Sequence, residues 1–288
     1  MNRPLAQSHL SQLAELLAWM DEDPSRQALA PEARTPEGLW WELLAGEGER
    51  AWVWLEQGRV QGYGALVSFW EGAALEGPIV RGGDGQALLA HLVRKARQKG
   101  YPTLYAFPEA RNLALKRLLE GAGFSAEHTT YFYTIGRTNL AYPTPAGFSI
   151  RLAEPCDPQV YRELYSRAED GWSLRLSWTD EELRQHFLGG EVELFMAYHT
   201  DNEKPVGLAE LELDDSKAEI AYIGVVPEAR GRGVGRALLG AAAERAFSYP
   251  QIQSLQVRAH DHEKAAQALY QRLGFRQESA VVTYALEL

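Results

Sequence analysis

Alternating apolar and polar positions in the C-terminal half of the chain predict strands separated by helices. Val206–Leu213 alternates apolar and acidic residues, which is typical of a strand with one buried face. Ala218–Val226 is rich in Ile, Tyr and Val, which predicts another strand. Further strands are expected over Val192–Tyr198, Leu255–Ala259 and Val281–Leu286. Two stretches between them have apolar residues at helical spacing, first at Val234, Leu238, Ala241 and Ala242, then at Ala266, Leu269, Tyr270 and Leu273.

The N-terminal half shows the same order of elements. Trp52–Leu55 and Val60–Phe69 predict a hairpin, and Thr103–Phe107 and Tyr131–Ile135 predict later strands. Two helical faces lie among them, on Leu89, Leu92, Val93 and Ala96 and on Leu115, Leu118, Leu119 and Ala122. Each half is therefore expected to be a mixed α/β unit of the α+β type, a mostly antiparallel sheet flanked by helices.

Two sequence motifs recur at an offset of about 150 residues, which indicates an internal repeat. The run from Gly233 to Leu239 is echoed by the run from Gly83 to Leu89. The run Leu269–Phe275 is echoed by Leu118–Phe124. We therefore expect two tandem domains of one fold, 1–142 and 146–288, joined where Pro143 and Pro145 interrupt regular structure.

Composition and charge narrow the classes of function. The chain has 288 residues and a net charge of −10, which argues against a nucleic-acid partner. Residues 1–143 carry −2 and residues 144–288 carry −8, so the second half either attracts a cationic substrate or is simply soluble. The single cysteine, Cys156, excludes an intramolecular disulfide and a cysteine metal cluster, and favours a reducing compartment. With no leader and no apolar run of membrane-spanning length, we expect a cytoplasmic protein, monomeric or homodimeric, without a metal site or membrane association.

A glycine-rich turn in the C-terminal half carries the strongest chemical signal. The sequence Arg230–Gly235 follows an apolar strand and opens an amphipathic helix. Glycines let the backbone approach a ligand closely, and a helix N-terminus offers free N–H groups and partial positive charge. The turn therefore suits a pyrophosphate, with Arg230, Arg232 and Arg236 available for charge-assisted hydrogen bonds, although a purely structural turn is the alternative. A Gly-Lys-Ser/Thr motif and the third glycine of a dinucleotide fingerprint are both missing.

Together, two motifs resemble those of the GNAT superfamily of acetyl-CoA-dependent N-acetyltransferases. Arg-x-x-Gly-x-Gly follows a strand that ends Val-x-Pro, at Val225–Gly235. Ala-x-x-Leu-Tyr-x-x-x-Gly-Phe follows at Ala266–Phe275, with a predicted strand between the two motifs. The resemblance covers both halves of the chain, and its motifs are intact only in the second.

The resemblance implies a role for each matching residue. The resemblance implies that the CoA pyrophosphate is bound by Arg230, Gly231, Arg232, Gly233, Val234, Gly235 and Arg236. It implies that the pantetheine arm lies along Gly224, Val225 and Val226, with the N–H of Val225 or Val226 holding the acetyl carbonyl. Tyr270 matches the general acid that protonates the departing thiolate, and Ala266 and Glu263 complete the cofactor set. Many relatives have Asn where Glu263 stands, and a carboxylate cannot donate as an amide does.

The general base is less determined by the sequence. Glu219 occupies a strand position that some relatives use for a base, while Glu210, Glu212 and Asp214 lie nearby in the chain. Strand alternation puts Glu210 and Glu212 on one face, either as part of the site or as a solvated surface.

The N-terminal copy departs from the pattern at the positions that matter for chemistry. Val80 stands for Arg230 and Leu119 for Tyr270, whereas Asn112 stands for Glu263. Leu119 has no proton to give, so we expect a degenerate copy.

The sequence thus predicts transfer of an acetyl group from acetyl-CoA, as cosubstrate, to a primary amine of a small molecule or peptide, by direct attack in a ternary complex. In this fold the acceptor site comes from the early helices, here Tyr161–Phe187, where Trp172 and Trp178 lie among acidic residues. Two alternatives stay open. The tandem organisation is similar to that of mycothiol synthases, which acetylate a thiol-linked amine, and a non-catalytic acyl-CoA sensor would share the same turn.

Overall fold

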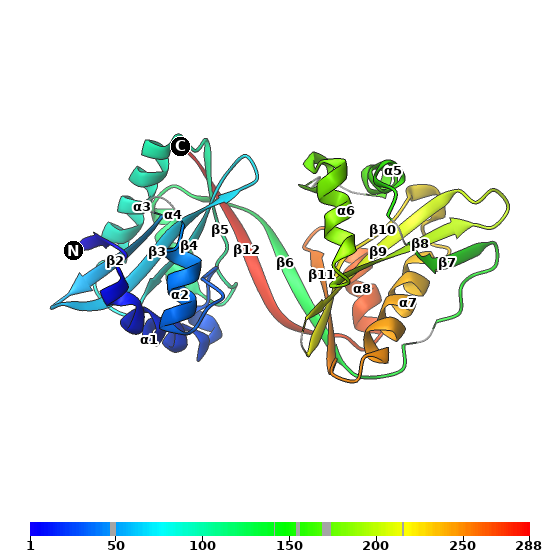
Figure 1. The fold of residues 1–288 in the computed structure, drawn as a ribbon, viewed down its shortest axis with the longest axis horizontal. Helices are drawn as coiled ribbons and strands as arrows, with labels where there is room; N and C mark the ends of the chain where they lie inside the picture. The colour runs from blue at the N-terminus through cyan, green and yellow to red at the C-terminus, as the bar shows by residue number, and fades with distance from the viewer. Residues whose placement is uncertain (47–49, 141, 154–155, 169–173, 215) are drawn as a thin grey trace. The chain divides into compact units, whose positions relative to one another are not determined.

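The computed structural model describes residues 1–46, 50–140, 142–153, 156–168, 174–214 and 216–288. Its contacts divide the chain into two compact units, which Figure 1 shows as ribbons. The N-terminal unit comprises Met1–Thr130 and Ser279–Leu288, and the C-terminal unit comprises Tyr131–Glu278. Within the described residues, no helix is long and apolar enough to cross a membrane.

The N-terminal unit is a six-stranded sheet with helices on both faces. Its elements are β1 (Asn2–Pro4), η1 (Gln7–His9), α1 (Leu10–Asp21), η2 (Pro24–Arg26), α2 (Pro36–Leu43), β2 (Ala51–Glu56), β3 (Arg59–Phe69), β4 (Gly72–Val80), α3 (Gly85–Lys99), β5 (Thr103–Ala106) and α4 (Leu113–Gly121). The sheet order is β1-β2-β3-β4-β5-β12, where β12 (Arg276–Glu287) comes from the end of the chain. Here β4 and β5 form a parallel pair.

The C-terminal unit repeats this plan. Its elements are β7 (Phe148–Leu152), α5 (Pro158–Ala168), η3 (Leu174–Ser177), α6 (Asp180–Leu188), β8 (Val192–His199), β9 (Pro205–Asp214), β10 (Lys217–Val225), η4 (Pro227–Ala229), α7 (Val234–Ser248), β11 (Ser254–His260) and α8 (Lys264–Arg272). The order is β7-β8-β9-β10-β11-β6, where β6 (Ser125–Gly136) precedes the unit's other strands in the chain. Here β10 and β11 form the parallel pair.

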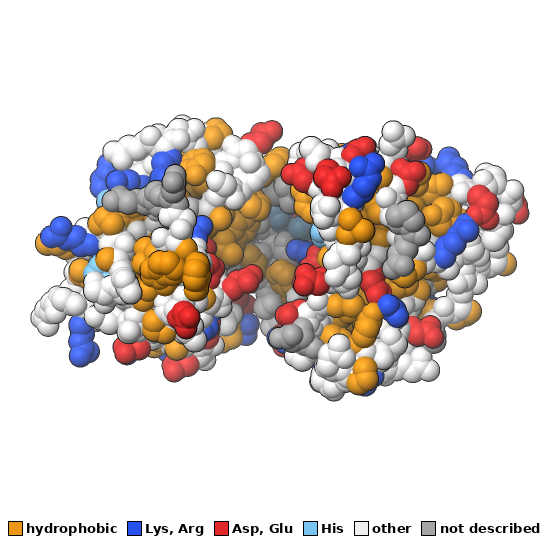
Figure 2. Space-filling view, viewed as in Figure 1, with side chains coloured by type: hydrophobic (Ala, Val, Ile, Leu, Met, Phe, Trp, Pro, Cys, Tyr) orange, Lys and Arg blue, Asp and Glu red, His pale blue; other side chains and the backbone are white. Residues whose placement is uncertain are grey.

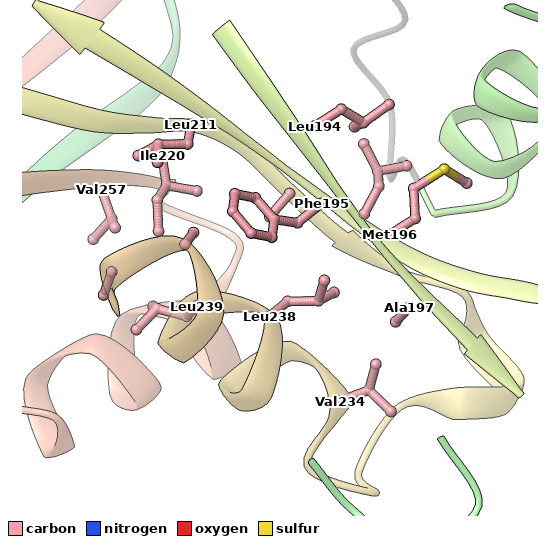
Figure 3. Close-up of a cluster of buried hydrophobic side chains, with 14 of the residues drawn as sticks. Leu194, Phe195, Met196, Ala197, Leu211, Ile220, Val234, Leu238, Leu239 and Val257 are labelled. Carbon is pink, nitrogen blue, oxygen red and sulfur yellow. The ribbon is translucent and has the colours of Figure 1, made fainter. Parts of the chain in front are cut away.

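Strand alternation gives the C-terminal sheet two distinct faces. Phe195, Leu211 and Ile220 point toward α7, where Leu238 and Leu239 meet them, as Figure 3 shows. Leu194 and Met196 lie on the opposite face, the one on which α5 and α6 pack (Figure 1). Glu210 pairs with Leu194 across β9 and β8, so its side chain belongs to the α5 and α6 face.

The fold class expected from the sequence is confirmed: each unit is a mixed, mostly antiparallel sheet flanked by helices. The chain division at 142–146 stays a prediction, and the compact units divide elsewhere. Residues Ser279–Leu288 belong to the N-terminal unit because β12 pairs with β5, with Tyr284 opposite Ala106. Residues Tyr131–Gly136 of β6 belong to the C-terminal unit, where β6 lies next to β11.

Candidate active site

The glycine turn joins β10 to the N-terminus of α7. Gly231 and Gly233 have φ values of +72° and +87°, a left-handed conformation that favours glycine. Gly233 is the N-cap residue, and no side chain among the described residues caps the helix. The first helical bond runs from the Ala237 N–H to the Gly233 carbonyl at 3.0 Å, so the three N–H groups before it are available to an anion. The expected cradle residues Gly231, Arg232 and Gly233 are exposed, with Gly235 half-buried and Val234 facing the core.

Beside this turn, β10 and β11 part after a short parallel ladder. Their pairing runs only from Lys217 opposite Ser254 to Ile220 opposite Val257, and β10 is irregular against β9 between Ile220 and Tyr222. The Val226 N–H donates to the Val206 carbonyl at 2.9 Å. Antiparallel alternation therefore directs the Val225 N–H away from β9, toward the split between β10 and β11.

That geometry separates the two candidate donors to an acetyl carbonyl. The Val226 N–H is used inside the sheet, which leaves Val225 as the candidate. Gly224 is buried next to it, and an ideal Cβ there would lie 2.5 Å from the Tyr222 hydroxyl oxygen and 2.9 Å from Cβ of Ala168. Glycine is needed at Gly224 because these two side chains occupy the space.

The three arginines of the turn have different surroundings. Arg230 Nε donates to the Val225 carbonyl at 2.9 Å and its Nη2 donates to the Ala168 carbonyl at 3.2 Å. Arg230 therefore ties the end of β10 to α5, and a direct phosphate contact stays a prediction. The guanidinium of Arg232 lies 4.5 Å from the ring centroid of Phe148, and that of Arg236 lies 4.3 Å from the ring of Tyr142. Aromatic faces thus support both cations at the helix N-terminus.

Tyr270 is buried on α8, with an exposed fraction of 2%. Its ring lies 5.8 Å from that of Tyr133 and 6.0 Å from that of Phe275, measured between centroids. Burial raises the pKa of Tyr270 well above its usual value, and the nearby Glu263 and Tyr133 add to the rise. The hydroxyl is therefore neutral and able to donate a proton.

Glu263, the departure from the family pattern, is turned toward the backbone. Its Oε2 accepts the His260 N–H at 2.6 Å, and its side chain does not cap α8. It stabilises the turn before α8 and offers no donor to a ligand. Ala266 lies half-buried in the first turn of that helix.

The acidic residues near the site have separate environments. Glu219 Oε1 lies 3.1 Å from Nε of Arg258 on β11, with the Glu219 side chain 26% exposed. Glu212 faces Glu219 across the strand pair and is half-buried, while Asp214 is exposed at the end of β9. Glu210 is fully buried, so the alternative of a solvated strand face is wrong for this residue.

Glu210 belongs to an aromatic cluster between β9, α5 and α6. Its carboxylate accepts the Tyr161 hydroxyl at 2.5 Å and lies 3.6 Å from Nε2 of His186. Tyr161 stacks on Tyr165, and Tyr165 packs on Tyr222 with centroids 4.6 Å apart. The row of tyrosines thus leads from Glu210 to the Tyr222 hydroxyl beside Gly224. Sequence reasoning missed this cluster, although the spacing of Tyr161 and Tyr165 on one helix face was a usable signal.

Other charges in the expected acceptor stretch have structural partners. Asp180 pairs with Arg162 at 2.5 Å, and Glu182 forms a capping box with Thr179. Figure 2 shows acidic and basic side chains side by side over α6. Trp172 lies outside the described residues, whereas Trp178 packs on His186 with centroids 5.0 Å apart. The outer face of α6 is therefore a mixed-charge surface, and the carboxylate aimed at the aromatic cluster is Glu210.

Cys156 shows no sign of a nucleophile. The thiol is buried, and burial raises its pKa to about 11, with Asp157 adding to the rise. It stays protonated near neutral pH.

The N-terminal counterpart of the turn differs in the features that would bind an anion. α3 is capped by Asp84, whose carboxylate accepts the Ala87 N–H at 2.9 Å. Its left-handed Gly83 is covered, because an ideal Cβ there would lie 2.4 Å from Nε1 of Trp54. Leu119, at the position of Tyr270, is buried in the apolar core.

Comparisons with known proteins agree with this geometry. The family model described as the acetyltransferase (GNAT) family matches residues 13–124 and again residues 158–275. A mycothiol acetyltransferase from Thermomonospora curvata is 26% identical over 294 residues, covering 95% of this chain and 93% of that protein.

Two solved structures share the fold over the full chain. The GCN5-related N-acetyltransferase from Sphaerobacter thermophilus has a TM-score of 0.79 at 19% identity and covers 100% of this chain and 95% of its own. A tandem GNAT protein from the clavulanic acid biosynthesis pathway has a TM-score of 0.70 at 20% identity, with 100% and 98% covered.

Proposed function

The chain belongs to the acetyltransferase (GNAT) family, and on that premise we propose that its C-terminal unit transfers an acetyl group from acetyl-CoA to a primary amine in a ternary complex. The observation that carries the proposal is the uncapped N-terminus of α7, next to the split between β10 and β11. The first feature suits a pyrophosphate. The second lets an extended amide-containing arm pair along β10 beyond the end of its ladder with β11, as in β-strand addition.

The proposed reaction assigns one task to each group. The Val225 N–H holds the carbonyl oxygen of the thioester and stabilises the negative charge that develops there. The amine nitrogen attacks the carbonyl carbon, the carbon–sulfur bond breaks, and Tyr270 gives its proton to the departing thiolate. Glu219 takes one proton from the incoming ammonium, and the second proton that the nitrogen loses as it becomes an amide reprotonates Tyr270. Its Arg258 partner stabilises the ionised carboxylate, which is the form that a base requires.

We propose that the acceptor enters on the α5 and α6 face, where Tyr165, Tyr222 and the buried Glu210 lie. Aromatic faces and a carboxylate suit a cationic amine. A small-molecule or peptide amine meets this requirement, and the protein is expected to act in the cytoplasm as a monomer or homodimer.

A narrower candidate is acetylation of a thiol-linked amine, as in mycothiol synthesis. What favours it is the match to a mycothiol acetyltransferase over nearly the whole length of both chains. Turnover with a cysteinyl amine, compared with polyamines and amino acids at equal concentration, tests this candidate. Equal or better turnover of the other amines would set it aside.

The cofactor site is tested by a matched pair of variants at the N-cap of α7. Gly233→Asp would bring a carboxylate to the helix N-terminus, as Asp84 does in the other unit, whereas Gly233→Asn has the same shape without the charge. Both side chains strain the left-handed backbone to a similar degree. Calorimetry should show acetyl-CoA binding at least about tenfold weaker for Asp than for Asn, the scale of a like-charge contact of about 1.4 kcal/mol. Equal affinities would move the pyrophosphate elsewhere, and absence of binding in the wild type would remove the proposed function.

A further inference from the structure

The N-terminal unit repeats the split between two parallel strands. β4 and β5 pair only over Ala73–Leu75 and Leu104–Ala106. Just beyond this ladder, the register of β4 against β3 shifts around Gly77. The same sequence of features precedes the candidate active site in the C-terminal unit, where the ladder between β10 and β11 stops at Ile220. The N-terminal copy has therefore kept the backbone arrangement that would take an extended ligand.

In this unit a piece of the chain itself spans the split. The bridging segment, Gln27–Leu29, follows η2, and Gln27 has extended backbone angles of −71° and 141°. The Leu29 carbonyl accepts the Gly77 N–H from β4 at 2.8 Å. On the other side, the Gln27 carbonyl accepts the Glu109 N–H and the side-chain amide of Asn112, both at 3.1 Å. The segment thus bonds to β4 and to the connection between β5 and α4.

Two of these donors, the Gly77 N–H and the Asn112 amide, lie at positions that can be compared with the C-terminal unit. Gly77 lies two residues past the last parallel pair, at the register shift of β4 against β3. Asn112 is the N-cap of α4 and matches Glu263 of the C-terminal unit. In the N-terminal unit the bridging segment accepts a hydrogen bond from the Asn112 amide. In the C-terminal unit, where the split is proposed to take acetyl-CoA, the matching position is the carboxylate of Glu263.

The phosphate end of the N-terminal copy is closed separately. Four residues connect β4 to α3, where eight connect β10 to α7. The Asp84 carboxylate accepts a helix N–H that an anion would otherwise take. Trp54 covers the space over Gly83. Both ends of a would-be cofactor site are therefore satisfied by groups of the protein.

We propose that Gln27–Leu29 is a built-in occupant of the N-terminal cofactor site, which closes this copy to acyl-CoA and leaves one CoA site in each chain. The inference rests on the proposed function for the location of the site. An extended peptide and a pantetheine arm both carry amide groups at short intervals, so one can satisfy the donors that the other would meet. The segment also supplies carbonyl acceptors to the Gly77 and Glu109 N–H groups, which lie beyond the ladder between β4 and β5.

Hydrogen exchange of the full-length protein, with and without acetyl-CoA, tests the inference. In the free protein the Gly77 and Glu109 amides should exchange slowly, and acetyl-CoA should leave them unchanged. Amides of β10 near Val225 should slow when acetyl-CoA is added, with a binding stoichiometry of one by calorimetry. Fast exchange at Gly77 in the free protein, slowing there on addition of acetyl-CoA, or a stoichiometry of two would overturn the proposal.

A matched pair of variants isolates the bridging contact. Asn112→Asp keeps an oxygen to cap α4 but sets a carboxylate against the Gln27 carbonyl. Exchange at Gly77 and Glu109 should accelerate roughly tenfold. Gln27→Ala removes a side chain and keeps the carbonyl acceptor, so exchange should match the wild type. No acceleration in Asn112→Asp would mean that the segment does not hold these donors. If acetyl-CoA fails to bind at all, the proposed function falls, while the exchange of Gly77 and Glu109 still decides whether the segment closes the split.

Discussion

Replacing Tyr270 with Phe removes a single hydroxyl from the C-terminal unit. The ring stays in its buried position, 5.8 Å from the ring of Tyr133 and 6.0 Å from that of Phe275. Because the apolar contacts survive, the free energy of unfolding should change by less than about 1.5 kcal/mol, the net value of one hydrogen bond. The affinity for acetyl-CoA should also stay close to that of the wild type.

The expected loss is in the chemical step. If Tyr270 protonates the leaving thiolate, kcat should fall by about 10²–10⁴-fold, which corresponds to about 3–5 kcal/mol in the barrier. Burial raises the pKa of Tyr270 above its ordinary value near 10. The neutral form therefore dominates at every pH below that value, and the rate should show no falling limb from Tyr270 near neutral pH.

Initial rates of thiol release, measured from pH 6 to 9, are the assay. Tyr133→Phe is the matched control, because Tyr133 is equally buried and its ring contacts that of Tyr270. It should keep kcat within about threefold of the wild type, a change of less than about 1 kcal/mol in the barrier. A Tyr270→Phe enzyme with near-normal kcat, or an equal loss in both variants, would refute the general-acid role and leave Tyr270 as a core aromatic.

Two further predictions follow from ion pairing and strand order. Glu219→Gln should lower kcat/KM mainly on the rising, acidic limb of its pH profile, since an amide cannot take the amine's proton; an unchanged pH profile would remove Glu219 as the base. Tyr284→Ala should reduce the free energy of unfolding by about 3–5 kcal/mol, as for other buried aromatics, and should speed hydrogen exchange in β5 of the N-terminal unit, against which Tyr284 pairs; faster exchange confined to Tyr131–Glu278 would contradict the pairing.

Local patterns in the sequence predicted those elements whose apolar residues recur at a regular spacing. The alternation in Val206–Leu213 gives the two faces of β9, one toward α7 and the other toward α5 and α6. The strand β4, Gly72–Val80, was missed because it is buried almost throughout and so shows no alternation. Its Gly77 and Pro78 also indicate a turn when only the neighbouring residues are considered.

In the candidate site, too, local features could be predicted from the sequence, whereas contacts between distant segments could not. The glycine turn was predictable because positive φ, strand end and helix start all lie within a few residues. The partner of Arg230, the Ala168 carbonyl, lies 62 positions away, and the partner of Glu219 is set by the register of β10 against β11. Such pairs depend on packing between distant segments, which no local pattern encodes.

The repeat in the sequence marks where each copy begins its turn and helices, but it cannot say which strand completes which sheet. Each copy is followed by a long strand, β6 after α4 and β12 after α8. Either strand could satisfy the edge of either sheet, because backbone hydrogen bonds need only an antiparallel neighbour with its apolar face toward the core. In the structure, β12 pairs with β5 in the N-terminal unit and β6 lies next to β11 in the C-terminal unit. A cut between residues 142 and 146 would therefore take β12 from the first sheet and β6 from the second, so each unit depends on both halves of the chain although the repeat makes them look separate.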